Sequence, residues 1–314
     1  MTSVVATKPP VLVEPHAARP LRSRRRGLLG GVLHNGKALT GTLLLLLFTV
    51  VAIAPGLFTS VSHPSQRAFE LSLHPSAHHW LGTTAFGQDI YAQLVYGTRE
   101  TLVIALVVGA LSTALSVIIG VSAAYIGGWV DDLLSLVTDV FLVIPTFPLI
   151  IVIAAYAGKG NLTVVIVVLV VTGWSYGARQ LRAQTLSLRN RDFLEAARVR
   201  GERTSYIIAA EVLPTMTSLV IANFLGAALF AVLTAAGLQF IGLGDPSSLS
   251  WGTMLHWAQS NEALQTGQEW WAIAPGLCVA LLGSAFALLN YAFDEISNPA
   301  LRPVRRLRGR RTHS

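Results

Sequence analysis

The sequence predicts an all-α integral membrane protein with six transmembrane helices and both termini in the cytoplasm. Of its 314 residues, 53% are hydrophobic and only 12% are charged, whereas a soluble domain has roughly 25% charged residues. Most of the chain therefore cannot face water. A membrane-spanning helix needs roughly 20 mostly apolar residues, and six stretches meet or approach this length: residues 38–58, 101–126, 133–157, 162–176, 218–241 and 272–293.

The distribution of Lys and Arg predicts the orientation of these spans. Of the 23 basic residues, 20 lie before the first span, in the loop after the fourth span, or after the last span. The opposite side has only three, namely Arg67, Arg99 and Lys159. Because cytoplasmic loops carry an excess of basic residues, we expect loop 179–214 inside and loops 59–98 and 242–271 outside.

Three parts follow from this layout. Residues 1–37 form a basic cytoplasmic arm rich in Pro, Ala and Arg, which we expect to be disordered. Residues 38–300 form the transmembrane domain, and residues 301–314 form a basic cytoplasmic tail. Basic segments are attracted to anionic lipid by about 1 kcal/mol per charge near the surface. No nucleic-acid-binding fold accompanies them, so lipid rather than nucleic acid is the expected contact.

The cytoplasmic loop contains the pattern of a short helix. Asp192 and Glu195 have the spacing of a capping box, in which the first residue caps the helix and the second bonds back to it. Gly201 is suited to end the helix in a left-handed conformation. The pattern therefore predicts a helix of about two turns over residues 193–200.

Two small residues, Ala196 and Ala197, are expected to give this helix a flat face, with Arg200 at its charged rim. A flat face with a charged rim suits docking into a groove on a partner. An amphipathic helix lying on the lipid surface would have a similar pattern. The residues by themselves leave both interpretations open.

The same loop resembles a known family. Glu195-Ala196-Ala197, then Gly201, then Leu213-Pro214 is similar to the EAA loop of permeases in bacterial ATP-binding-cassette importers. In that family the loop holds a helix that inserts into a cleft of the cytoplasmic ATPase. The resemblance thus implies an ATPase-coupling role for Asp192, Glu195, Ala196, Ala197, Arg200, Gly201 and Pro214.

Other motifs resemble the C-type permease of dipeptide, oligopeptide and nickel importers. The resemblance extends over residues 40–302 and rests on Leu81-Gly82-Thr83 with Gly87 and Asp89, Tyr96-Gly97, Gly127-Gly128-Trp129-Val130-Asp131, Ile241-Gly242-Leu243-Gly244, Ser250-Trp251-Gly252, Trp270-Trp271, Pro275-Gly276 and Asn298-Pro299. It implies the type I importer permease fold in the bacterial cytoplasmic membrane. The chain would be a non-catalytic subunit that forms half of a pathway for di- or oligopeptides.

The resemblance also implies partners: a second, homologous permease, one or two ATPases that bind ATP and Mg²⁺, and an extracytoplasmic substrate-binding protein. The chain itself has no phosphate-binding Gly-x-x-x-x-Gly-Lys-Ser/Thr loop. ATP is therefore expected on another chain, and no cofactor is expected on this one.

Three positions depart from the family pattern. Thr84 stands where the family usually has Asp, Gln88 where it usually has Arg, and Glu211 where His is common. The first two remove an expected charge pair at the external mouth. The resemblance places the mouth, and its contact with the binding protein, at four residues: Thr84, Gln88, Asp89 and Trp251.

The histidines of the first outside loop bear on which cargo is expected. His74 and His78 have the i, i+4 spacing that could bring two imidazoles onto one face of a helix. Together with His79 they would matter only if nickel, or a nickel chelate, were the cargo. Solvated histidines are the simpler interpretation, and peptides are the preferred cargo; no other metal site is expected.

Four polar residues lie within the predicted spans: Asp139, Asn223, Thr234 and Gln239. Polar side chains at membrane depth are candidates for a transport pathway. They could equally form hydrogen bonds between helices, because residues 218–241 are rich in Gly and Ala and allow close helix contact.

Two other classes of function find little support. An intramembrane zinc protease would need His-Glu-x-x-His in a span, and a serine type would need Ser with His or Lys at membrane depth. Neither pattern is present. A stand-alone channel or carrier would not need the cytoplasmic helix or the large outside loops, and the sequence shows no internal repeat of the kind that many carriers have.

Overall fold

The computed structural model describes residues 35–156 and 162–297. The arm up to residue 34, the tail 301–314 and the Asn298-Pro299 motif lie outside the described residues. Helices make up the described part, which has no strand beyond one isolated bridge between Thr83 and Asp89. The α-helices are α2 (Gly36–Ile53), α3 (Ile90–Ser116), α4 (Ser122–Ile126), α5 (Gly128–Val143), α6 (Thr146–Tyr156), α7 (Leu162–Gly173), α8 (Ser175–Leu188), α9 (Asp192–Val199), α10 (Thr204–Tyr206), α11 (Leu213–Thr215), α12 (Thr217–Phe240), α13 (Trp251–Ser260) and α14 (Glu269–Ser297). Three further segments are the 3₁₀ turn η1 (Pro55–Leu57) and the π-helical η2 (Val117–Val121) and η3 (Ile207–Val212).

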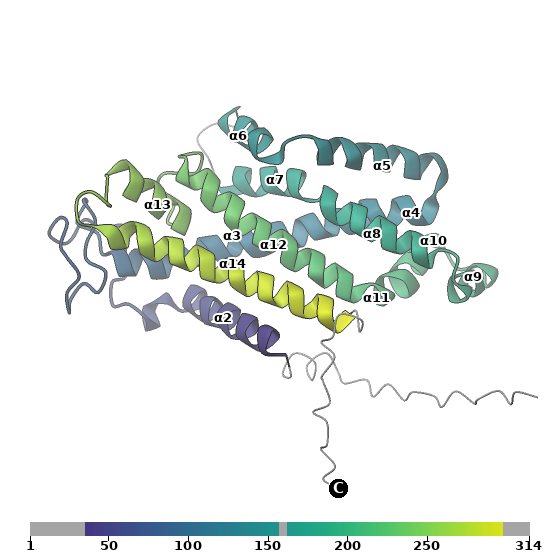
Figure 1. The fold of residues 1–314 in the computed structure, drawn as a ribbon, viewed down its shortest axis with the longest axis horizontal. Coiled ribbons are helices and arrows are strands. Elements are labelled where there is room, and N and C mark those ends of the chain that lie inside the picture. Colours follow the sequence, from purple (N-terminus) through teal and green to yellow (C-terminus); the bar gives the residue numbers. More distant parts are fainter. Residues whose placement is uncertain (1–34, 157–161, 298–314) are drawn as a thin grey trace, which may run out of the picture.

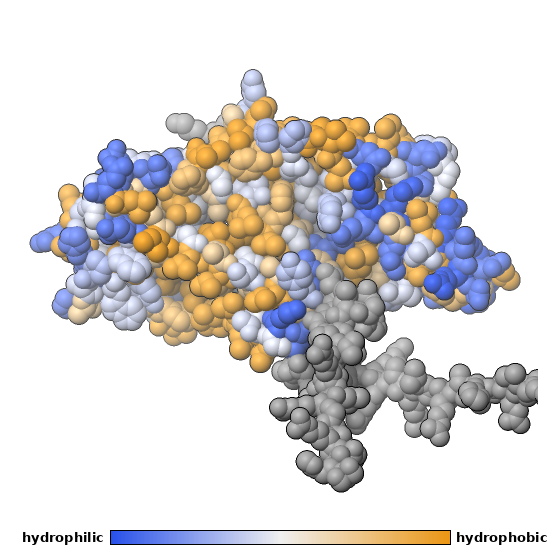
Figure 2. Space-filling view, viewed as in Figure 1, coloured by the Kyte–Doolittle hydropathy of each residue, from blue (hydrophilic) through white to orange (hydrophobic). Residues whose placement is uncertain are grey.

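The expected all-α membrane fold is confirmed. Among the described residues, five continuous helical segments are long and apolar enough to cross a membrane, and α5 with α6 can make a sixth crossing. In Figure 1 the long helices run side by side, with the outside loops and α13 at one end and α9 at the other. Figure 2 shows hydrophobic side chains along the middle of the molecule and hydrophilic ones gathered at both ends, as a bilayer requires.

The third expected span, residues 133–157, is not one straight helix. Its two parts, α5 and α6, meet at an angle of 87°. The break lies at Ile144, which is extended (φ −67°, ψ 128°), directly before Pro145. Proline has no N–H and disfavours the helical conformation in the preceding residue, which explains the bend.

Two other spans are longer than expected. The second begins at Ile90 rather than at residue 101, because Asp89 caps its first turn by accepting a hydrogen bond from the backbone N–H of Ala92 at 2.7 Å. The fourth continues as α7 and α8 to Leu188, so that Arg179 and Arg182 lie on a helix and not in a loop.

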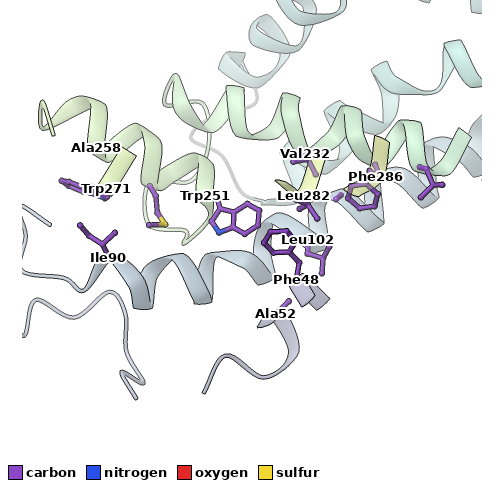
Figure 3. Close-up of a cluster of buried hydrophobic side chains, with 14 of the residues drawn as sticks. Phe48, Ala52, Ile90, Leu102, Val232, Trp251, Ala258, Trp271, Leu282 and Phe286 are labelled. Atoms are coloured by element: carbon purple, nitrogen blue, oxygen red, sulfur yellow. The ribbon is translucent and has the colours of Figure 1, made fainter. Parts of the chain in front are cut away.

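The largest apolar core lies between α2, α3, α12, α13 and α14 (Figure 3). Trp251, at the start of α13, is 0% exposed and lies edge-on to Phe48 of α2, with ring centroids 5.3 Å apart. Its indole N–H donates to the backbone oxygen of Leu94 in α3 at 3.0 Å. The outside helix α13 is therefore anchored inside the membrane-spanning bundle.

The two π-helical segments lie nearer the cytoplasmic end. A π-helix adds one residue to a helical turn and is frequent at functional sites. Within η2, Gly120 packs so closely on α8 that a Cβ atom there would lie 2.3 Å from the backbone oxygen of Ala178. No other residue fits at this contact without a shift of the two helices.

Candidate functional site

A cavity of about 420 Å³ lies within the bundle, between the α5–α6 bend, the α7–α8 break and α12. Its lining includes apolar rings such as Phe141 and Phe230, and none of its side chains is charged. The hydrogen-bonding side chains come from six helices: Thr113, Ser116, Thr146, Thr172, Ser175, Tyr176, Gln180, Asn223 and Asn290. The cavity can therefore hydrogen-bond a polar molecule without selecting for its charge.

One wall of the cavity is held together at the break between α7 and α8. The Ser116 hydroxyl in α3 lies 2.6 Å from the backbone oxygen of Trp174 and 2.8 Å from that of Ser112, so its proton can be shared between them. A Cβ atom on Gly177 would lie 2.6 Å from Asn223 Oδ1 and 2.7 Å from Ser116 Oγ. Glycine at this position lets α3, α8 and α12 meet at the cavity.

Of the four pathway candidates, only Asn223 lines this cavity. Asp139 instead forms an ion pair with Arg179 on α8 at 2.5 Å. Thr234 is buried in α12 away from the cavity. Gln239 is buried at the outer end, where its Oε1 accepts a hydrogen bond from the Ser250 hydroxyl at 2.8 Å. Thr234 and Gln239 therefore do not line this cavity.

The sequence reasoning missed most of the polar lining. Thr113 and Ser116 on α3, Thr172 on α7 and Asn290 on α14 all face the cavity. They were visible as hydroxyl and amide groups inside apolar spans. Which face of each helix they occupy depends on how the helices pack, and hydropathy does not give this.

The expected capping box of the cytoplasmic helix is absent. The helix α9 begins at Asp192, its cap residue is Arg191, and no side chain caps it. A box starting at residue 191 would need Glu or Gln at residue 194, which is Leu. The expected end is confirmed, because Gly201 is left-handed with φ 76°.

The inner side of α9 is packed into the protein. Leu194 and Ala197 are fully buried in a cluster with η2, α8 and η3 that includes Val121, Leu181 and Ile207. The two alanines therefore do not share one flat face: Ala197 points inward and Ala196 outward. The exposed side presents Phe193, Glu195, Ala196 and Val199.

Residues 116–302 match the family described as the binding-protein-dependent transport system inner membrane component. The chain belongs to this family. The oligopeptide transport system permease protein OppC of Mycobacterium tuberculosis is 32% identical over 286 residues, or 90% of this chain and 97% of that protein. The dipeptide transport system permease protein DppC of Bacillus subtilis is 30% identical over 272 residues, or 85% of this chain and 83% of that protein.

The family makes the chain a permease subunit of an ATP-binding-cassette importer, of the C-type that the sequence motifs resemble. It is a multi-pass protein of the bacterial cytoplasmic membrane and a non-catalytic component. The ATPase of such a transporter is a separate chain.

Glu211, one of the departures from the family pattern, lies inside the permease's cytoplasmic loop. Its carboxylate is 3.6 Å from the guanidinium of Arg200, which follows α9. Arg198, two residues before Arg200, donates to the hydroxyl of Tyr125 at 3.3 Å and lies over its ring at 5.2 Å. The two arginines tie the end of α9 to η3 and α4. Pro214 is the second residue of α11, the short turn between η3 and α12.

At the outer mouth of the permease, the two other departures lie beside each other. The Thr84 N–H donates to the Gln88 backbone oxygen at 2.8 Å, and the Gln88 N–H donates to the Thr84 hydroxyl at 3.2 Å. A turn held by these bonds stands where the family pattern places a charge pair. Trp251, also expected at the mouth, is buried and has no surface to offer a binding protein.

The histidine pair that the alternative nickel cargo would need is not formed on a helix. His74 and His78 lie in irregular backbone, so their spacing does not place them on one helical face. His79 forms a 2.7 Å contact through Nδ1 with Oδ2 of Asp89, the residue that caps α3. Among the described residues, no group of three or more His, Cys, Asp or Glu side chains could hold a metal ion.

Proposed function

We propose that this permease imports di- and oligopeptides and forms half of their pathway, beside a second, homologous permease. One or two cytoplasmic ATPases would bind ATP and Mg²⁺, and an extracytoplasmic binding protein would deliver the peptide. The relatives from Mycobacterium tuberculosis and Bacillus subtilis support this cargo, because both are named peptide permeases and align over most of their length.

The uncharged cavity is the observation that carries the proposal. Peptides differ in their side chains but share backbone N–H and C=O groups, which are costly to leave unpaired away from water. Hydroxyl and amide side chains can donate and accept, so Asn223, Asn290 and Ser116 could pair with any peptide backbone. A charged lining would instead select peptides by charge.

The same lining does not favour nickel, the alternative cargo. Nickel is usually bound by imidazole or other nitrogen and oxygen ligands, and the cavity contains neither histidine nor carboxylate. The His74, His78 and His79 group would be required for a nickel route, and these residues do not converge.

We assign the exposed side of α9 to contact with the ATPase. Phe193, Ala196 and Val199 give this helix an apolar outer surface, and Asp192, Glu195 and Arg200 surround it. Because Leu194 and Ala197 are buried against η2 and α8, a displacement of α9 would be transmitted to α8, which lines the cavity, and to η2, which continues α3. Gly201 ends α9 itself, and Pro214 lies in α11, the turn that joins η3 to α12.

Uptake by cells lacking this chain tests the cargo. We expect restoration of the chain to restore uptake of a labelled dipeptide or pentapeptide and to leave nickel uptake unchanged. Restored nickel uptake without peptide uptake would refute the proposal.

Asn223→Leu tests the cavity itself. Removing the amide leaves the peptide backbone without one hydrogen-bond partner. If that bond stabilises the bound peptide by roughly 1.4 kcal/mol, uptake of neutral, acidic and basic peptides should fall together by about tenfold. Thr234→Val is the matched control, because Thr234 is a buried polar residue of the same helix that does not line the cavity. Equal losses in both variants would show that helix packing, and not cargo, is affected.

A further inference from the structure

A second pocket, of about 290 Å³, lies at the outer end where the two outside loops meet. We call it the outer pocket. The first loop and the start of α3 supply Ser65, Arg67, Phe86, Gln88 and Gln93 to its lining, and the second loop with α13 supplies residues that include Pro246, Trp257 and Trp271. Neither loop could form it without the other.

Aromatic rings build the outer pocket. Phe86 meets Trp257 edge-to-face with centroids 5.7 Å apart, and meets Trp271 in the same manner at 6.0 Å. The guanidinium of Arg67 lies over the Phe86 ring, 5.1 Å from its centroid. A cation held on an aromatic face in this way is stabilised without being neutralised.

Two strong donors of the outer pocket, Arg67 and Trp271, have no acceptor among the described residues. Arg67 forms no ion pair with any described residue. Trp271 is 1% exposed, and its indole N–H has no acceptor. The two glutamines are already engaged, since Gln88 donates to the backbone oxygen of Ser65 and accepts from Gln93, each at 2.8 Å.

The charges around the outer pocket make Arg67 unusual. The described outer end has two permanent cations, Arg67 and Arg99, against six carboxylates: Glu70, Asp89, Glu100, Asp245, Glu262 and Glu269. A basic group on a partner protein could pair with carboxylates at several places on this end. Among the described residues of this end, an acidic side chain could pair with a cation inside a pocket only at Arg67.

We propose that the outer pocket receives an Asp or Glu side chain of the extracytoplasmic substrate-binding protein. The carboxylate would pair with the Arg67 guanidinium, and its short apolar stem would pack against the aromatic wall that Phe86 forms with the two tryptophans. Arg–carboxylate pairs are strong and directional, so one such contact would fix how the binding protein sits on the permease. The proposal rests on the importer function proposed above.

The test uses the complete transporter in lipid nanodiscs, with the binding protein that supports peptide uptake as the probe. Its affinity for the transporter is measured by biolayer interferometry. We expect Arg67→Glu to weaken binding by at least about tenfold, because a pocketed ion pair becomes a repulsion. Arg99→Glu, which makes the same charge change outside the pocket, should stay within about twofold of wild type.

A charge-reversal scan of the binding protein completes the test. One Asp→Arg or Glu→Arg change should restore affinity for the Arg67→Glu transporter and weaken binding to the wild type. Equal weakening by Arg67→Glu and Arg99→Glu would show only bulk charge and overturn the proposal. Unchanged affinity with a raised KM for peptide uptake would assign the pocket to the cargo carboxylate and also overturn it.

Two observations separate this proposal from the importer function and from misfolding. If no binding protein stimulates ATP hydrolysis by the wild-type transporter, the importer function fails and the pocket assignment fails with it. If stimulation occurs in the wild type and is equally sensitive to binding protein in Arg67→Glu, only the pocket assignment fails. Arg67→Lys keeps the cation, so it should retain more affinity than Arg67→Glu if the variant transporters are folded.

Discussion

The two ends of the permease are built differently. At the outer end, α13 begins with a complete capping box, in which Ser250 and Thr253 bond to each other's backbone, and Trp251 is locked into the transmembrane core (Figure 3). At the cytoplasmic end, α9 has no side-chain cap and its packing rests on two buried residues, Leu194 and Ala197.

The elements behind these ends differ in the same way. The outer loops are held by aromatic contacts, such as Phe86 with Trp271, and by the Asp89 cap of α3. The α9 helix packs on the two π-helical segments, η2 and η3, instead of on regular helix. Because π-helical turns are rare interruptions of regular α-helix and are frequent at functional sites, we expect the cytoplasmic end to shift more readily than the outer end.

Of the variants that test this difference between the two ends, Trp251→Ala is expected to lower stability the most. Removing a fully buried Trp and its hydrogen bond to Leu94 should lower the free energy of unfolding by about 3–5 kcal/mol. Thermal unfolding in detergent micelles measures it, with Trp129→Ala as the control, because Trp129 is 74% exposed. Equal shifts in the melting temperature would mean that the outer end is not locked by this residue.

A smaller effect on stability, but a specific one on function, is expected from Gly201→Val. A residue with a Cβ atom pays about 1–2 kcal/mol in the left-handed conformation that Gly201 adopts, and valine is bulky besides. The end of α9 should therefore move, so that peptide uptake falls while the ATPase still hydrolyses ATP.

Gly276→Val is the control for that variant, because Gly276 lies in α14 with open space around it and an ordinary backbone conformation. Both variants are compared by uptake per ATP hydrolysed, in proteoliposomes. Normal coupling in Gly201→Val would contradict the assignment of α9 to the ATPase contact.

The same contrast explains what the sequence could predict. Helical spans follow from composition, because a backbone in lipid must satisfy its hydrogen bonds within a helix, and the bend at Pro145 follows from proline chemistry. The glycine at position 201 could also be predicted, since its need is local. These features depend on residues close together in the chain.

Features that depend on tertiary packing could not be predicted. Asp192 and Glu195 match a capping box by spacing, but α9 starts one residue earlier, because the Glu195 N–H bonds to the backbone oxygen of Arg191. The capping box that the structure does contain begins at Ser250 of α13. Its third helical residue is Thr253 rather than Glu or Gln, so the usual sequence pattern misses it. The cavity and the outer pocket each combine residues from distant segments, which hydropathy does not align.

The smallest expected effect on stability compares the two ends most directly, because Asp89 and Asp192 lie at the starts of α3 and α9. Asp89→Ala removes a cap bond and the contact with His79, so it should cost about 1 kcal/mol of unfolding free energy. Asp192→Ala removes no capping bond, and its cost should stay within about 0.5 kcal/mol. Chemical denaturation of both variants in micelles measures the difference, and equal costs would show that α9 is capped after all.

Since Asp192 does not hold its own helix, any loss of peptide uptake in Asp192→Ala at normal stability must come from a contact with another chain, on the side where the ATPase is proposed to bind.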